Sequence, residues 1–351
     1  MLFAARTGQG LGAAILSPAA LSIITASFHG HAKAKALAAW GAVGGAGAAI
    51  GVVVGGVLTE LADWRMIFAI NVPLGLFALL VGRHALPNTP PTAKGQRLDI
   101  RGAILAGTGM FLLVYPLTQG HELGWPLWTF GMLAASVVVL ATFVVTQKGL
   151  IRLSVFTKRS YSSGVVFVVA FFAVITGFSL IVGLFLQLGL GYSPLKASLT
   201  MAPWAIGAFL GSAAGSMALN GLGRRVLHIG LGMMAIGLTW LAVSISAEGL
   251  SIAPLAIFGA GMGMIFVPLF DIIVGDLADD EVGSASGVLT SVQQLGASLG
   301  VAVLGTVFFA NASAGAFVGA ARIVTIVALG LTAVTFVLGF LLPREAKAAA
   351  H

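Results

Sequence analysis

The sequence predicts an all-α membrane protein, a polytopic bundle of about eleven transmembrane helices. Hydrophobic residues make up 58% of its 351 residues and charged residues only 8%, which is more apolar than the core of a water-soluble protein requires. The apolar residues also gather in stretches of about twenty, the length of helix that crosses a bilayer. No stretch alternates residue by residue as a membrane β-strand does, so helices are the expected spanning form.

The expected spans follow these apolar stretches along the chain, with boundaries good to a few residues. Each is expected to be helical, because lipid offers no hydrogen-bond partners to an open backbone. In chain order the spans are Leu2–Ser27, Leu37–Leu58, Met66–Gly82, Gly102–Gln119, Leu127–Gln147, Gly164–Gln187, Ala197–Leu219, Val226–Ile245, Ile252–Val274, Gly287–Ala310 and Ile323–Leu342.

The cations indicate how the spans are oriented. If alternate connections share a side, fourteen of the 18 Lys and Arg fall on one side and Arg65, Lys196 and Arg322 on the other, with Arg6 inside the first span. The positive-inside rule then places the richer side and the carboxyl terminus in the cytoplasm. Because this topology accounts for the net charge of +7, no nucleic-acid partner is expected.

Several kinds of chemistry have no support in the sequence. The absence of cysteine excludes disulfides and a thiol nucleophile. No phosphate-binding Gly-x-x-x-x-Gly-Lys-Ser/Thr loop is found, so direct use of ATP would need a separate subunit. His29 and His31 are too few for a metal site, and no nucleophile elbow accompanies a Ser, His and acid set. An enzyme is therefore not expected.

Two longer connections, Arg83–Arg101 and Lys148–Tyr161, divide the chain. Residues 1–90 would hold three spans, residues 91–160 an inserted pair with its cytoplasmic linkers, and residues 161–351 six spans. Three further spans before the first would give six, two and six, with both termini in the cytoplasm. Doubled six-helix halves are typical of secondary transporters.

Several segments resemble the motifs of a known family. They are Arg6–Ala14 (RTGQGLGAA), Gly47–Gly56 (GAAIGVVVGG), Trp64–Gly75 (WRMIFAINVPLG), Leu186-Gln187 with Gly191–Pro194, and Gly283–Gly287 with Gln293–Gly296. In this order they are similar to the fourteen-span drug:proton antiporter branch of the major facilitator superfamily. The first segment resembles that family's fourth-helix motif, the second its fifth-helix antiporter motif, and the third its signature entering the sixth helix.

This resemblance implies an amino-terminally truncated fourteen-helix arrangement of the superfamily type, lacking the first three helices. It implies a secondary active transporter of the bacterial plasma (inner) membrane that exports amphipathic or lipophilic small molecules in exchange for protons by alternating access. The implied partners are the substrate, the lipid bilayer and the missing amino-terminal helices. No cofactor beyond the proton gradient and no oligomer is required. The alternative is a truncated paralogue or fragment with only a structural role.

Two charges inside apolar runs are the candidates for proton coupling. An Arg at mid-helix costs about 2.5 to 3.5 kcal/mol, so Arg6 is expected to face a cavity, although it could instead snorkel from a helix end. The resemblance implies a coupling role for it, with Gln9 and Gly10 in the same motif. Asp271 is the second candidate, although it lies near the cytoplasmic end of its span, where water could solvate it.

Glycines and a short loop make up the candidate gating elements. Gly47, Gly51, Gly55 and Gly56 match the antiporter motif, with Val52 where the motif has proline. Four-residue spacing of small residues equally predicts close helix packing, as for Gly207, Gly211 and Gly215. The segment Asn220–Arg225 resembles a degenerate loop motif, which implies gating roles for Gly223, Arg224 and Arg225.

The polar and aromatic side chains of two later spans are weaker candidates. Gln187 is a candidate substrate contact. The aromatic run Phe167, Phe171, Phe172, Phe178 and Phe185 could line a cavity or face lipid. His228 is expected to pack with a hydrogen bond rather than to relay protons.

Overall fold

The structure is a computed structural model. It describes residues 8–10, 12–13, 15–16, 19–20, 23–24, 27–28, 30–85, 100–120, 123–146, 153–275, 277, 279–312 and 316–343. The main helices are α2 (Gly30–Leu61), α3 (Met66–Ala69), α4 (Asn71–Ala85), α5 (Ile100–Gln119), α6 (Leu127–Thr146), α7 (Arg159–Leu184), α8 (Pro194–Leu222), α9 (Arg225–Ser244), α10 (Ile252–Val274), α11 (Asp279–Asn311) and α12 (Phe317–Leu338). A π-helical turn, η2 (Phe185–Gly189), extends α7.

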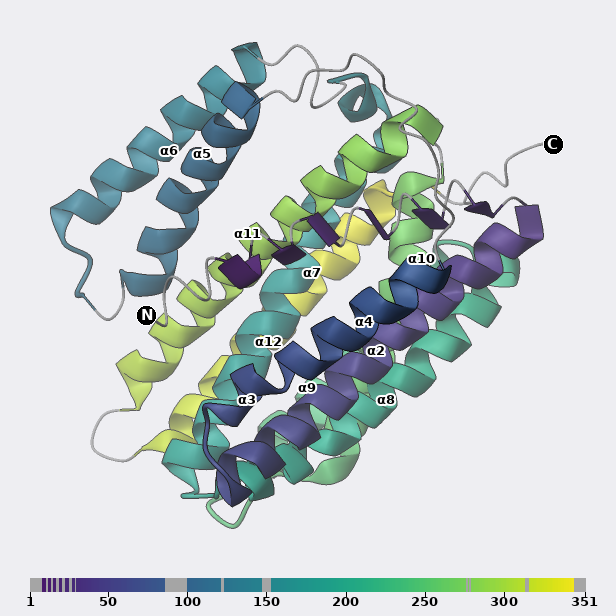
Figure 1. Cartoon of the computed structure of the whole chain (residues 1–351). Coiled ribbons are helices and arrows are strands. Elements are labelled where there is room, and N and C mark those ends of the chain that lie inside the picture. The colour runs from purple at the N-terminus through teal and green to yellow at the C-terminus, as the bar shows by residue number, and fades with distance from the viewer. Residues whose placement is uncertain are drawn as a thin grey trace.

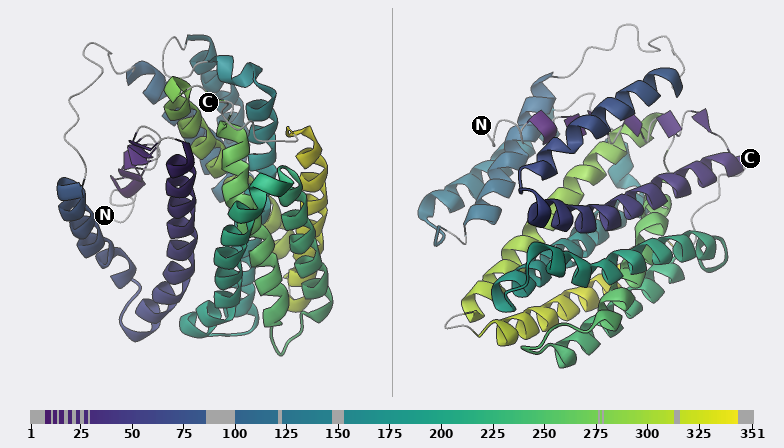
Figure 2. Two further views of the ribbon diagram at one scale, coloured as in Figure 1. Left: turned by 90° about the vertical axis from the view of Figure 1, so that its right-hand side faces the viewer. Right: turned by 60° about the horizontal axis from the view of Figure 1, so that its bottom comes forward.

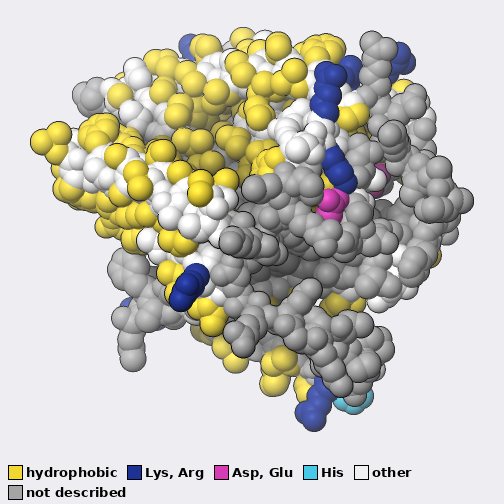
Figure 3. Space-filling view, turned by 90° about the horizontal axis from the view of Figure 1, so that it is seen from above, with side chains coloured by type: hydrophobic (Ala, Val, Ile, Leu, Met, Phe, Trp, Pro, Cys, Tyr) yellow, Lys and Arg dark blue, Asp and Glu magenta, His cyan; other side chains and the backbone are white. Residues whose placement is uncertain are grey.

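The predicted all-α membrane bundle is confirmed. Nine helices of the described part are long and apolar enough to cross a membrane, and α2 adds the apolar segment Ile50–Leu61. Every expected span after the first falls on a described helix. The first, Leu2–Ser27, lies largely outside the described residues. Many large apolar side chains on the helices are exposed, among them Leu127, Val145 and Val243. Where Figure 3 colours the side chains of one face, hydrophobic atoms cover much of the surface. A surface of this kind fits lipid as the surrounding medium.

Helices α7 to α12 pack around one apolar core (Figure 1). The closest packing is between α8 and α10, where a Cβ on Gly211 would lie 2.8 Å from the carbonyl carbon of Ala260, and one on Gly215 would lie 2.8 Å from Cα of Met264. Gly207 meets Ala256 in the same way. The prediction that these glycines allow close helix packing is thus confirmed.

The pair α5–α6 lies beside α11 and apart from α2, α4 and α8 (Figure 1). The two helices pack against each other, and Gly109 of α5 lies under Leu140 of α6, 2.6 Å from a Cβ placed on the glycine. Buried hydroxyls within α6 bond to its own backbone, as Ser136 does to the Leu133 carbonyl at 2.6 Å. The main contacts of the pair are therefore with each other, and α5 also contacts α11.

Helix α2 lies along α8, and α4 lies on the side of α2 away from α7–α12 (Figure 2). None of the side chains of α4 is buried in the structure. We call the end of the bundle where α2 ends and α8 and α10 begin the outer end, and the end where α7, α9 and α11 begin the inner end. The positive-inside prediction puts the inner end in the cytoplasm.

Polar contacts link the helices at the inner end. Lys158 Nζ lies 2.6 Å from Glu281 Oε2, and this pair joins the start of α7 to the start of α11. The Tyr161 hydroxyl, which is buried, donates to the Ala285 carbonyl at 2.9 Å. This ion pair brings together the segments that begin α7 and α11.

Candidate functional site

The junction between α2 and α8 joins two blocks of helices. We call the helices before residue 90 the first block and helices α7 to α12 the second block. The closest point of the junction is Gly56, the buried glycine of the motif on α2. A Cβ placed on Gly56 would lie 2.6 Å from Ser198 Cβ and 3.0 Å from the Pro194 carbonyl oxygen. Only a residue without a side chain lets α2 approach α8 this closely.

The other motif glycines are arranged differently. A Cβ on Gly47, Gly51 or Gly55 would meet no atom within 4 Å among the described residues. Within the described part of the chain, close packing therefore explains Gly56 but not these three positions. Helix α2 runs without interruption through Val52, where the antiporter motif has proline. This continuity is expected, because valine keeps the backbone hydrogen bond that proline would remove.

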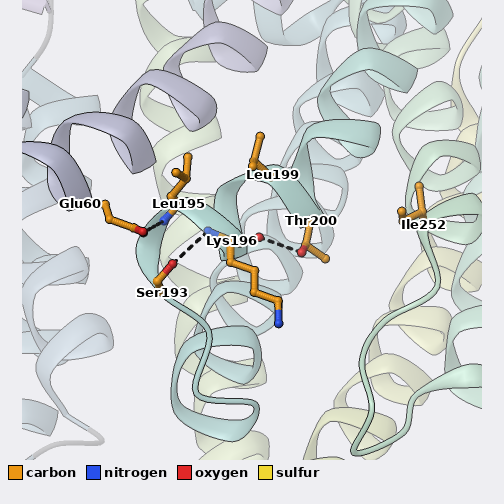
Figure 4. A pocket seen from close by; sticks show the side chains of 7 residues that line it. All are labelled: Glu60, Ser193, Leu195, Lys196, Leu199, Thr200 and Ile252. Carbon is orange, nitrogen blue, oxygen red and sulfur yellow. Dashed lines mark hydrogen bonds between the residues drawn. The ribbon is translucent and has the colours of Figure 1, made fainter.

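A cleft opens at the outer end of this junction (Figure 4). It has a volume of about 410 Å³ and is lined by Glu60, Ser193, Leu195, Lys196, Leu199, Thr200 and Ile252. The carboxylate of Glu60, on the last turn of α2, accepts a hydrogen bond from the Leu195 N–H at 2.8 Å. The Ser193 hydroxyl, followed by the Leu195 N–H, holds the pKa of Glu60 below its ordinary value. An ionised carboxylate thus bridges the two blocks.

Local sequence explains why α8 presents an open N–H at this point. Pro194 is the first residue of α8 and has no N–H to donate. The Ser193 side chain caps the helix by accepting from the Lys196 N–H at 3.3 Å. The Leu195 N–H is consequently available to a group from outside the helix, and Glu60 accepts from it.

The cation of the cleft is directed at an aromatic ring. Lys196 Nζ lies 3.7 Å from the centre of the Tyr192 ring, and the Tyr192 hydroxyl contacts the Glu248 carbonyl at 3.4 Å. These contacts link the start of α8 to the connection between α9 and α10. Lys196 therefore has a cation–π contact within its own block.

Of the predicted proton-coupling residues, Asp271 does not line this cleft. Arg6 lies outside the described residues. Gln9 and Gly10, in the same motif, are exposed. Asp271 is exposed in the last turn of α10, towards the inner end. A coupling role for Arg6 or Asp271 stays a prediction.

The predicted substrate contact Gln187 and the aromatic run lie on α7 and its extension η2, and the role of Gln187 stays a prediction. Gln187 is exposed in η2, at the outer end of α7, and does not line the cleft. Phe178 is buried and lies 5.1 Å from the Phe258 ring and 5.9 Å from the Trp204 ring, between ring centres. Phe167, Phe171 and Phe185 are also buried, and Phe172 is partly buried. The placement of this run on a cavity or lipid face is therefore wrong for these four buried rings, which pack between helices.

The loop motif after α8 makes contacts within one block. Gly223 ends α8 with a φ of 49°, in the region that favours glycine. Arg224 Nη1 donates to the carbonyls of Phe340 at 2.9 Å and Leu342 at 2.5 Å, at the end of α12, while Arg225 is exposed. His228 packs between Phe336 and Phe340, with ring centres 4.8 and 4.5 Å away. A gating role for Gly223, Arg224 and Arg225 stays a prediction.

Comparison with known proteins identifies the family of this chain. The family model described as Major Facilitator Superfamily matches residues 1–301. The chain belongs to the major facilitator superfamily. As a member of it, the chain is a transporter-family membrane protein and not an enzyme.

The relatives of this superfamily member include exporters. It is 39% identical over 328 residues to the probable actinorhodin transporter of Streptomyces coelicolor, covering 88% of this chain and 57% of that protein. It is 31% identical to the tetracenomycin C resistance and export protein of Streptomyces glaucescens, covering 86% and 57%. This superfamily member spans a little over half the length of these relatives.

Among solved structures, the nucleoside transporter NupG aligns with this superfamily member at a TM-score of 0.45 and 16% identity, over 93% of this chain and 87% of that one. This likeness is too distant to bear on function.

Sequence reasoning missed Glu60. The expected span ended at Leu58, so Glu60 counted as a loop residue. Two signals could have found it. Ser193-Pro194 is a pattern that begins helices, and Glu60 lies four residues after Gly56, on the same helix face. Both signals concern one contact, the hydrogen bond from the Leu195 N–H to Glu60.

Proposed function

We propose that this protein is a secondary active transporter that exports amphipathic or lipophilic small molecules in exchange for protons. The observation that carries the proposal is 39% identity to a probable actinorhodin transporter over 88% of this chain. The tetracenomycin C resistance and export protein supports the same class of activity. The specific substrate and the coupling to protons are parts of the proposal.

In this mechanism, two helical blocks rock about a shared cavity and present it to each side of the membrane in turn. Helix α2 of the first block lies against α8 of the second, at the buried Gly56. Movement between blocks would separate α2 from α8 along this contact. The proton gradient supplies the energy, and no cofactor is needed.

Proton coupling is assigned to Arg6, with Asp271 as the second candidate. A guanidinium beside a carboxylate lowers the pKa of the acid, and protonation of the acid removes the attraction. Arg6 would thus exchange partners as a proton binds and leaves. Gln9 and Gly10 belong to the same motif, and Gln187 is proposed as a substrate contact on the outer side.

The protein is proposed to lie in a bacterial plasma membrane with its carboxyl terminus in the cytoplasm. Membership in the superfamily and the spanning helices support a multi-pass membrane protein. The distribution of Lys and Arg supports the orientation.

The alternative is a structural role without transport. One observation favours it: α4 has no buried side chain in the structure.

The test reconstitutes the purified chain in vesicles that hold a pH-sensitive dye and an acidic lumen. Addition of a lipophilic cationic dye outside is expected to raise the internal pH, because protons leave as the dye enters. Arg6→Gln should abolish this response, and Arg159→Gln, which changes an exposed inner-end cation, should leave it intact. A chain that binds the dye without releasing protons would favour the structural role.

A further inference from the structure

The outer end of the α2–α8 junction carries a contact between blocks that involves charge. The Glu60 carboxylate accepts from the Leu195 N–H at 2.8 Å, and the acceptor and donor belong to different blocks of the chain. The first N–H groups of a helix carry partial positive charge, so an anion there is stabilised. The contact therefore holds α2 to the start of α8.

The position of Glu60 on α2 makes this contact part of the junction. Glu60 lies four residues after Gly56, and residues four apart share a helix face. On α8, Leu195 lies three residues before Ser198, against which Gly56 packs. The carboxylate contact thus lies one turn outward from the closest approach of the two helices, at the mouth of the cleft (Figure 4).

The other charged groups near this contact have partners of their own. Lys196 of α8 has its Nζ over the Tyr192 ring at 3.7 Å. Asp63 and Arg65, which follow α2, pair with each other at 3.2 Å. Glu248 approaches through its backbone carbonyl, and α10 contributes the apolar Ile252 to the cleft. Backbone and hydroxyl donors of α8 are therefore the partners that the structure gives the Glu60 carboxylate.

We propose that Glu60 is the outer gating residue of the α2–α8 junction, and that its ionised carboxylate holds the two blocks together at the outer end by capping α8. This rests on the proposed alternating-access function and adds the residue that sets the balance between closed and open states on the outer side. Opening separates Glu60 from Leu195 and transfers both groups to water. A proton on the carboxylate removes the charge that α8 stabilises and favours opening.

The sign of the pH dependence follows from the contacts. The pKa of Glu60 is lowered when the contact is formed. The contact is therefore fully present above the ordinary pKa of a glutamate and is lost as the pH falls through the lowered value. The open state is expected to grow in acid.

The test measures the distance between blocks directly. The chain has no cysteine, so the pair Leu61→Cys and Leu188→Cys can be spin-labelled without other changes. Both positions are exposed at the outer end, one in each block, and neither lines the cleft. Double electron–electron resonance in lipid nanodiscs then measures the distance distribution between the two labels, which gives the ratio of open to closed molecules.

In this reporter background Glu60→Gln removes the charge and keeps the shape. The open-to-closed ratio is expected to rise about two- to five-fold near neutral pH, the range for one exposed charge at a helix N-terminus. It should no longer change in acid. Asp63→Asn, which neutralises a neighbouring carboxylate outside the contact, is the matched control and should behave as the parent.

Two outcomes would overturn the proposal: E60Q and its parent share one distance distribution and one acid response, or D63N shifts the ratio as E60Q does. Circular dichroism of each variant shows whether the helices are intact. The distance measurement requires no transport. If the open-to-closed ratio depends on pH and on Glu60 but the chain moves no dye, the gating role of Glu60 stands and the export function is rejected. If the chain transports dye but E60Q does not change the ratio, the export function stands and the gating role of Glu60 is rejected.

Discussion

Replacement of Gly56 by alanine tests whether α2 and α8 must touch. A Cβ there would lie 2.6 Å from Ser198 Cβ and 3.0 Å from the Pro194 carbonyl oxygen, whereas ordinary contacts need about 3.5 to 4.0 Å. Helix α2 would have to withdraw by about 1 Å. Overpacking of this kind costs about 1–3 kcal/mol, and the cost falls on the closed junction alone.

Gly51→Ala is the matched control, because a Cβ at Gly51 meets no described atom within 4 Å. Both variants gain about 0.5–1 kcal/mol of helix propensity, so this gain cancels when the two are compared. With the spin-label pair at residues 61 and 188, Gly56→Ala is expected to raise the open-to-closed ratio about five- to 150-fold over Gly51→Ala. Ser198→Gly should restore most of the ratio in the Gly56→Ala background, because it removes the contact with Ser198 and leaves the one with the Pro194 carbonyl oxygen at 3.0 Å. Equal ratios for the two alanine variants, or no rescue by Ser198→Gly, would refute the packing argument.

Two further predictions concern the inner end, and both are read as the free energy of unfolding in detergent. Arg224→Gln removes a charged donor from the carbonyls of Phe340 and Leu342 and should lower the free energy of unfolding by about 1–2 kcal/mol. The control Arg225→Gln changes an exposed residue and should have little effect. Equal losses in the two variants would contradict the role of Arg224 at the end of α12. Lys158→Met removes the cation that pairs with the Glu281 carboxylate, which is 9% exposed, and should lower the free energy of unfolding by about 1–3 kcal/mol. If the buried charge is the cause, adding Glu281→Gln should reverse the loss. Additive losses in the double variant would contradict this cause.

The helices could be predicted because the bilayer sets their length and composition. Every expected span after the first coincides with a described helix, since about twenty apolar residues have one stable form in lipid. Close packing of α8 against another helix could be predicted as well, although its partner α10 could not. Gly207, Gly211 and Gly215 recur every four residues, and backbone contact between helices needs small residues on one face.

The direction in which side chains point could not be predicted in the same way. Helix α7 is apolar on every side, so its sequence gives no sign of which face is buried. Phe178 could therefore be assigned to a cavity or to lipid, and it packs against Trp204 and Phe258 instead. Glu60 was missed for a related reason, because hydropathy ends a span where the polar residues begin, while the helix and its contact continue beyond.

The two faces of α8 differ in a way that bears on movement. Towards α10 the helix presents Gly207, Gly211 and Gly215, each in contact with the opposing backbone, so separation there would open a close-packed interface along several turns. Towards α2 the close contact is made by Gly56, and the outermost link is a hydrogen bond from the Leu195 N–H to an exposed carboxylate. Water can replace that link at little cost, since both groups are solvated when they part. If the blocks move, α8 is expected to travel with α10 and to separate from α2, and a spin-label pair across α8 and α10 should keep one distance while the pair across α2 and the second block changes.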